Sequence, residues 1–112
     1  MTKYLISFPS RAMQVSDAEL PAVAAASRAV VAAAKAAGVY VFAAGIDETV
    51  PPLLVDGDGT VTQASYPDSR LDGGFTILEL PDAAAATDWA RRIAEACRCP
   101  QEVRAFMFDP LT

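Results

Sequence analysis

The sequence predicts a single α+β domain over residues 1–112. Three observations predict it: two alanine-rich segments with helical periodicity, short apolar segments between turn residues, and one Asp-Gly-Asp-Gly turn. A length of 112 residues suits one domain. Hydrophobic residues make up 53% of the chain, which is enough for a packed core and argues against global disorder.

The first helix is expected to begin near Ser16 and to run to about Ala37. Ser16 and Glu19 have the spacing of a capping box, and Gly38 suits the position after a helix end. Pro21 leaves two interpretations open, because proline beyond the first turn removes a hydrogen bond. Either the first turn is irregular, or the regular helix begins nearer Pro21. The face expected to be buried carries Leu20, Val23, Ser27, Val30, Val31 and Ala34.

Asp82 is a favourable N-cap for the second helix, which is expected over residues 83–96. Strands are expected where alternating or continuous apolar residues lie between turn residues, at 3–8, 39–44, 75–80 and 102–108. Residues 53–55 and 60–62 are expected to form a hairpin, because the Asp and Gly residues between them supply the positive φ of tight turns. The resulting order is a ferredoxin-like β-α-β-(β-hairpin)-β-α-β sheet with two helices on one face.

Several of these strands are apolar on both faces. This holds for residues 39–44 and 75–80, and the last strand offers Phe106 and Phe108 opposite Val103 and Met107. A sheet with one solvated face should instead alternate apolar and polar side chains. With both helices on one face, a second copy of the chain is the economical cover for the other. The sequence therefore predicts a homodimer whose sheets pack face to face.

Charge and composition exclude several classes of protein. The chain has 14 acidic and 9 basic residues and a formal net charge of -5, so it lacks the basic footprint of a nucleic-acid binder. Histidine, the commonest general base and metal ligand, is absent. We expect no metal site and no cofactor.

The expected location is cytoplasmic. The apolar run at the N-terminus is too short for a signal-peptide core, and no segment is long and apolar enough to span a membrane. Cys97 and Cys99 are too close in sequence for good disulfide geometry, and no further cysteine or histidine completes a zinc set. We therefore expect two free thiols, with Cys97 packed on the helix face and Cys99 in the turn.

Five residues are candidates for a ligand-binding site: Tyr66, Asp68, Arg70, Asp47 and Tyr40. Loops on a rigid sheet often carry binding residues, and Arg70 suits an anion while Asp68 suits a base. A solvated loop with mutually paired charges is the favoured alternative for these loop residues. Asp47 and its neighbour Glu48 suit acid/base work if one pKa is raised, although solvated charges are the default. Tyr40 offers a stacking surface to an aromatic ligand, and core packing is the favoured alternative.

Two glycine-containing motifs are better explained by structure than by ligand binding. The segment Asp56-Gly57-Asp58-Gly59 lacks the later glycine and glutamate of a calcium loop, which favours a turn. Gly73-Gly74 precedes a strand and not a helix N-terminus, so the context of a phosphate loop is missing.

Several segments resemble the YCII-related family, also called the DGPF domain, over nearly the whole chain. They are Met1-Thr2-Lys3-Tyr4-Leu5-Ile6, Ala36-Ala37-Gly38-Val39, the loop from Ser65 to Gly73-Gly74-Phe75, Asp88-Trp89-Ala90-Arg91-Arg92-Ile93-Ala94, and Glu102-Val103-Arg104. The resemblance implies ferredoxin-like subunits that pair as a dimeric α/β barrel, with a cleft between helix, hairpin and signature loop. Some relatives carry a His-Asp pair. Here the family's Asp-Gly-Pro is replaced by Gln63-Ala64-Ser65 and histidine is absent, so that mechanism does not carry over.

The sequence thus predicts a small homodimeric YCII-related protein that acts as a binding or interaction module without catalysis. Its expected partners are itself and a small-molecule ligand, with no nucleic acid and no membrane. Two alternatives stay open. One is an enzyme that acts on a small substrate in the cleft near the signature loop, with Tyr66, Asp68 and Arg70 as acting groups. The other is a regulatory partner of a sigma-factor-type transcription protein, which the family resemblance alone implies.

Overall fold

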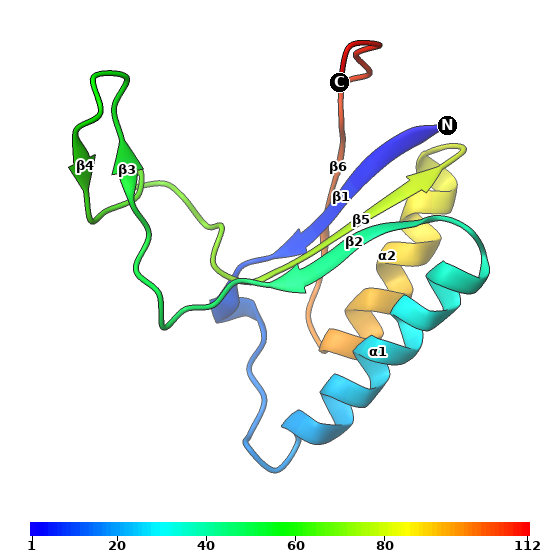
Figure 1. The fold of residues 1–112 in the computed structure, drawn as a ribbon. Coiled ribbons are helices and arrows are strands. Elements are labelled where there is room, and N and C mark those ends of the chain that lie inside the picture. Colours follow the sequence, from blue (N-terminus) through cyan, green and yellow to red (C-terminus); the bar gives the residue numbers. More distant parts are fainter.

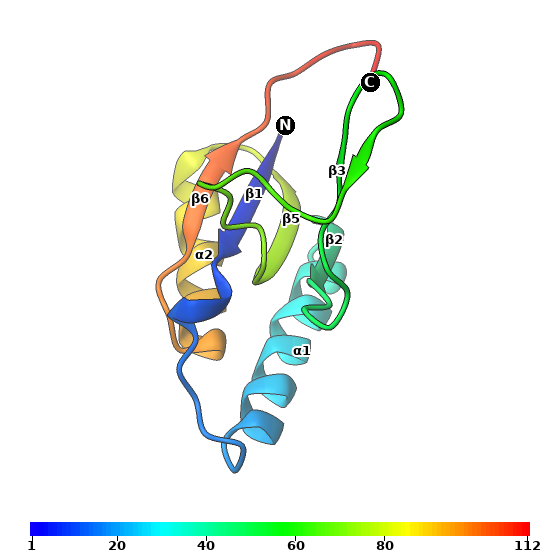
Figure 2. The same cartoon turned by 90° about the vertical axis from the view of Figure 1, so that its left-hand side faces the viewer.

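A computed structural model describes residues 1–112 and confirms the mixed α+β class (Figure 1). Four strands form an antiparallel sheet in the order β2-β5-β1-β6, and β3 and β4 form a separate hairpin. Both helices lie on one face of the sheet (Figure 2). The elements are β1 (Thr2–Phe8), η1 (Ser10–Ala12), α1 (Leu20–Ala36), β2 (Tyr40–Gly45), β3 (Leu54–Val55), β4 (Val61–Thr62), β5 (Gly74–Leu80), α2 (Ala83–Cys97) and β6 (Glu102–Ala105).

The core lies between the helices and the middle of the sheet. β1 pairs with β5 over all seven of its residues and with β6 on its other side. Alternation along these strands turns Ile6, Leu78 and Leu80 toward the helices, where each is essentially inaccessible to solvent. Ala86 and Ile93 of α2 pack in the same cluster. The small side chains of α2 let that helix lie close to the sheet.

The regular part of α1 begins at Leu20, so the later of the two expected starts is correct. Glu19 is the N-cap residue and Pro21 lies in the first turn, where a missing backbone N–H leaves no hydrogen bond unmade. Ser16 is therefore not the cap that the sequence predicts. Its backbone N–H and its hydroxyl both donate to the Glu19 carboxylate, so only the glutamate half of the capping box forms. The helix ends at Ala36, and Gly38 follows with a φ of 74°, as expected for a C-terminal glycine.

Asp82 is the N-cap of α2, as predicted. Its carboxylate oxygen Oδ1 accepts a hydrogen bond from the backbone N–H of Ala85 at 2.9 Å. At the other end, Arg98 is in the left-handed region with a φ of 57° and is the C-cap residue. A non-glycine residue adopts this conformation at a steric cost of roughly 1–2 kcal/mol.

The prediction of a last strand reaching Phe108 is wrong, because β6 ends at Ala105. Its pairing with β1 stops where Ala105 lies opposite Tyr4, two residues short of the start of that strand. The N–H of Phe106 still donates to the Lys3 carbonyl at 2.9 Å. Beyond it the chain leaves the sheet, and Met107 and Phe108 are almost fully exposed.

No helix covers the face of the sheet away from α1 and α2 (Figure 2), and this face is less apolar than the sequence suggests. Leu5, Phe42 and Ile77 lie at its centre by the strand register. Two ion pairs flank them, Lys3 with Glu79 and Arg104 with Glu102. The hairpin and the C-terminal segment project from the sheet on the side away from the helices (Figure 1).

Gly73 and Gly74 allow the end of β1 to approach the start of β5. A Cβ atom on Gly73 would lie 2.0 Å from the carbonyl oxygen of Phe8 and 2.8 Å from the carbonyl carbon of Pro9. A Cβ atom on Gly74 would lie 2.6 Å from the Phe8 ring. β5 begins at Gly74, so a strand follows this pair as expected. Close backbone approach is the structural reason for the two glycines.

Gly73→Ala should therefore lower the free energy of unfolding by about 3 kcal/mol, because the added methyl group collides with backbone that cannot move independently. The matched control is Gly57→Ala, where a Cβ would meet nothing within 4 Å, and its effect should stay within about 0.5 kcal/mol. Urea unfolding followed by circular dichroism measures both. Equal stability of the two variants would contradict the described approach.

Candidate functional site

A cavity of about 740 Å³ lies between α1 and the half of the sheet formed by β2 and β5. Its walls are mostly apolar. The sheet contributes Phe8, Tyr40, Ala43, Ala44, Gly45, Gly74, Phe75, Thr76 and Leu78, and the helices and the loop before them contribute Met13, Val23, Ala24, Ser27, Arg28, Val30, Val31, Ala32, Ala34, Lys35, Ile93, Ala96 and Cys97.

Short side chains on both walls explain why this space is not filled. α1 presents several alanines, and β2 presents Ala43, Ala44 and Gly45 opposite them. The predicted apolar face of α1 forms one wall, since Val23, Ser27, Val30, Val31 and Ala34 all line the cavity. Leu20 is the exception and is partly exposed at the start of the helix. The periodicity that predicts a core-facing stripe thus marks one wall of the cavity.

Three polar side chains give the cavity its chemistry. Arg28 and Lys35 reach it from α1, and neither forms an ion pair within the chain. The Lys35 ammonium nitrogen Nζ lies 5.0 Å from the centre of the Tyr40 ring, a favourable cation–π distance. No aspartate or glutamate is among the lining residues.

Tyr40 is held in place by an irregularity of β2. The pairing of β2 with β5 shifts between Tyr40 and Phe42, and such bulges re-aim side chains. The Tyr40 hydroxyl accepts a hydrogen bond from the backbone N–H of Ala43 at 3.1 Å. Its own proton has no acceptor in the chain, so the hydroxyl can donate to a ligand.

A smaller pocket of about 200 Å³ adjoins the cavity through Phe8, Met13, Gly45 and Gly74, which line both. Its charged side chains are acidic, whereas those of the cavity are basic. The Asp72 carboxylate accepts from the backbone N–H of Ser10 at 2.9 Å, and the Glu48 carboxylate accepts from the Ser10 hydroxyl at 3.0 Å. The two ends of the joined space therefore differ in charge.

Of the five residues predicted for a ligand site, Tyr40 alone lines the cavity. Asp47 lies in the exposed loop after β2, where its carboxylate accepts from the hydroxyl and the backbone N–H of Thr49 at 2.6 and 3.0 Å. The hydroxyl bond, followed by the backbone bond, holds the pKa of Asp47 below its ordinary value. Asp47 therefore stabilises its own turn as a carboxylate.

Tyr66, Asp68 and Arg70 lie together in the loop before β5, outside both pockets. All three are exposed, Tyr66 to 74%. The Arg70 guanidinium donates to the carbonyls of Ser69 and Pro67 at 2.8 and 3.3 Å, so it folds back on its own loop. The sequence did not single out Arg28 and Lys35, because exposed basic residues on a helix look like solvated charges.

Cys97 and Cys99 are free thiols, as expected, and Cys99 in the turn after α2 is buried as well as Cys97. The Cys97 sulfur lies 3.6 Å from the Ser27 hydroxyl at the cavity wall. Burial, and to a lesser extent the nearby Cys97, raises the pKa of the Cys99 thiol, which disfavours the reactive thiolate. Both sulfurs act here as core groups.

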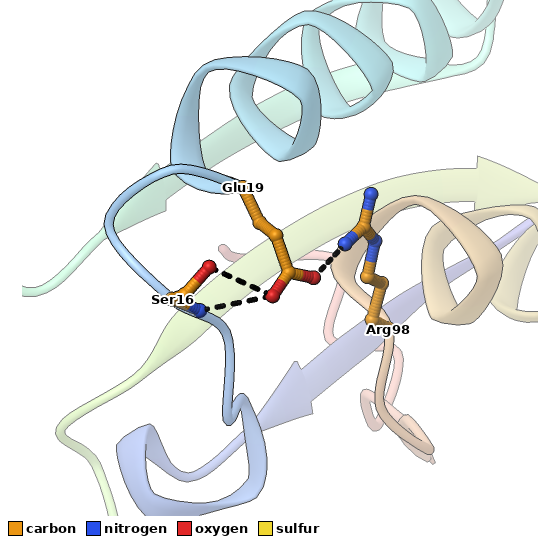
Figure 3. A network of polar contacts seen from close by, with 3 residues as sticks. All are labelled: Ser16, Glu19 and Arg98. Atoms are coloured by element: carbon orange, nitrogen blue, oxygen red, sulfur yellow. Dashed lines mark hydrogen bonds and ion pairs between the residues drawn. The ribbon is translucent and has the colours of Figure 1, made fainter.

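Glu19 links the start of α1 to the end of α2 (Figure 3). One carboxylate oxygen accepts from the Ser16 hydroxyl at 2.8 Å and from its backbone N–H at 3.3 Å, and the other accepts from Arg98. The Ser16 hydroxyl bond is the first cause that lowers the pKa of Glu19, followed by the Ser16 N–H bond and the Arg98 charge. These contacts hold together the ends of the two helices that flank the cavity.

Comparison of the chain with models of known protein families finds no match, and comparison with curated proteins finds no relative. Neither helix is long and apolar enough to cross a membrane. No three residues among Cys, Asp and Glu come together in a way that could hold a metal ion. The cavity geometry therefore carries the functional argument.

The link made by Glu19 should make stability depend on pH. Because folding lowers the pKa of this carboxyl, its contribution is present above the ordinary value of 4.5 and is lost as pH falls through the folded-state value. Glu19→Gln should therefore destabilise the protein at pH 7, and this difference from the original chain should shrink below pH 4.5. Urea unfolding at several pH values measures it. The control for net charge is Glu95→Gln, which removes an exposed carboxylate without an ion-pair partner. If the stability difference caused by Glu19→Gln persists unchanged at low pH, the role of Glu19 is contradicted.

Proposed function

We propose that the protein is a homodimeric binding module of the YCII-related type that holds a small, largely apolar ligand in the α1 cavity. The observation that carries this proposal is the cavity itself. Its volume of about 740 Å³ falls within the range of small-molecule sites, roughly 300–1,000 Å³. Such sites combine apolar walls with a few polar groups that orient the ligand, as Arg28, Lys35 and Tyr40 do here.

A ferredoxin-like arrangement supports the family assignment. The sheet order β2-β5-β1-β6, with α1 and α2 each connecting two strands on one face, is the order expected for a split β-α-β fold. The hairpin of β3 and β4 is the insertion that the sequence predicts. A cytoplasmic location and the absence of catalysis belong to the same proposal.

The surface area of the single chain supports a homodimer. The chain exposes 7744 Å², whereas a monomer of 11.8 kDa is expected to expose about 5,900 Å². Its radius of gyration of 15.6 Å likewise exceeds the roughly 13 Å expected for a compact domain of this length. The exposed area in excess of the expected value is more than the roughly 800 Å² that each partner contributes to a standard interface.

The uncovered face of the sheet is the surface that we assign to the second copy. Its centre is apolar and its flanking ion pairs leave no net charge on it, which suits an interface that meets itself about a two-fold axis. The cavity lies between α1 and the sheet, and α1 lies on the opposite face (Figure 2). Pairing through the sheet therefore leaves the cavity accessible.

Filling the cavity should abolish ligand binding. The neutral fluorescent probe 1-aminoanthracene should bind the original chain with an increase in its emission. Ala24→Phe places a ring in the cavity, because Ala24 lines it, and should abolish this increase. The control is Ala25→Phe at the neighbouring, exposed position of α1, which should bind as the original chain does. No binding to the original chain, or equal binding to both variants, would refute the assigned site.

Charges on the open sheet face should separate the dimer. Phe42 and Phe106 are 53% and 45% exposed in the single chain, and a buried, unpaired glutamate at either position costs more than the interface gains. Sedimentation velocity at micromolar concentration should show a dimer for the original chain and monomers for Phe42→Glu and Phe106→Glu. Leu20→Glu, a similarly exposed position on the helix side, should remain dimeric. A monomeric original chain would refute this part of the proposal.

A further inference from the structure

We infer that the ligand of the cavity is an apolar molecule with a single carboxylate headgroup, bound with the headgroup between Arg28 and Lys35. This inference rests on the proposed function, since it names the class of ligand for the same site.

The charges at the cavity differ from those of the chain as a whole. The chain is acidic, with 14 acidic and 9 basic residues, yet the cavity is lined by two basic residues and by no acidic one. Every ion pair in the protein lies elsewhere. The cations at the cavity therefore have no internal partner, and a ligand with an anionic group would supply it.

The two cations are placed to act on one headgroup. They are seven residues apart on α1, which is two helical turns, or about 10.5 Å along the axis on the same face. Long side chains that lean toward each other can span that distance. Lys35 lies over the Tyr40 ring, and the Tyr40 hydroxyl offers a further donor to a carboxylate oxygen. Arg28 and Lys35 carry donors only, and the Tyr40 hydroxyl, whose oxygen already accepts from Ala43, has its proton free to donate. Donors are what a carboxylate requires.

The smaller pocket that adjoins the cavity disfavours a second anionic group on the ligand. Glu48 and Asp72 line the adjoining pocket around Ser10. A ligand that extends from Arg28 and Lys35 toward Gly45 and Gly74 would bring its far end near these two carboxylates. Like charges there repel, so the far end should be uncharged. This arrangement selects a monocarboxylate over a dicarboxylate.

Displacement of bound 1-aminoanthracene by four ten-carbon compounds tests the inference. They are decanoate, the neutral decanamide, the cationic decylamine and the dicarboxylate sebacate. The Kd of decanoate obtained from displacement of the probe should be about tenfold lower than that of decanamide, since a charge-assisted hydrogen bond is worth about that factor. Decylamine and sebacate should displace the probe more weakly than decanoate does.

Charge-removing variants identify the groups responsible. The double variant Arg28→Gln with Lys35→Gln should still bind the probe, but decanoate and decanamide should then compete equally. Arg91→Gln, which removes an exposed α2 cation outside the cavity, should keep the original preference. Equal competition by decanoate and decanamide in the original chain, or an unchanged preference in the double variant, would overturn the inference and leave the proposed function standing. Failure of the probe to bind the original chain would overturn both.

Discussion

The pairing of β1 with β5 along their whole length is the interaction on which the rest of the structure depends. It joins the first seven-residue strand of the chain to a strand more than sixty residues later, and it requires the glycine pair where the two backbones meet. Its register decides which side chains point to the helices and which to the open face. Ile6 and Leu78 form the core because of it, and Leu5 and Ile77 face outward for the same reason. β2 and β6 then only have to add to the two edges of this pair.

The sequence predicts the ends of a helix well where contacts between neighbouring residues determine them. The Asp82 cap and the glycine after α1 are contacts between near neighbours, and both lie where the sequence predicts. The end of β6 could not be predicted, because it depends on where the chain leaves the edge of the distant strand β1. The residues of the candidate site are less predictable than the secondary structure. The sequence predicts Tyr40 as a site residue, but Arg28 and Lys35 line the cavity only because α1 lies over β2, which no local pattern reveals.

Covering a four-stranded sheet with two helices on one side has a consequence for both faces. The helix side has room to spare, because alanine-rich α1 stands over a small-residue edge strand and leaves a cavity between them. No helix covers the other side (Figure 2), and we propose that a second chain covers its apolar centre. The placement of both helices on one face of the sheet thus leaves a cavity on that face and an apolar surface on the other. In the function that we propose, ligand binding and self-association use opposite faces of the same strands, so neither must be weakened to accommodate the other.

Arg98 shows how a backbone position can become linked to a distant side chain. Glycine would adopt the left-handed conformation there without steric cost, and it would therefore be the simplest residue to end α2. Arginine is tolerated because its guanidinium reaches Glu19 across the ends of the two helices. Positions 19 and 98 are consequently coupled in their effect on stability. A substitution of Glu19 removes the contact that offsets the backbone cost of arginine at position 98.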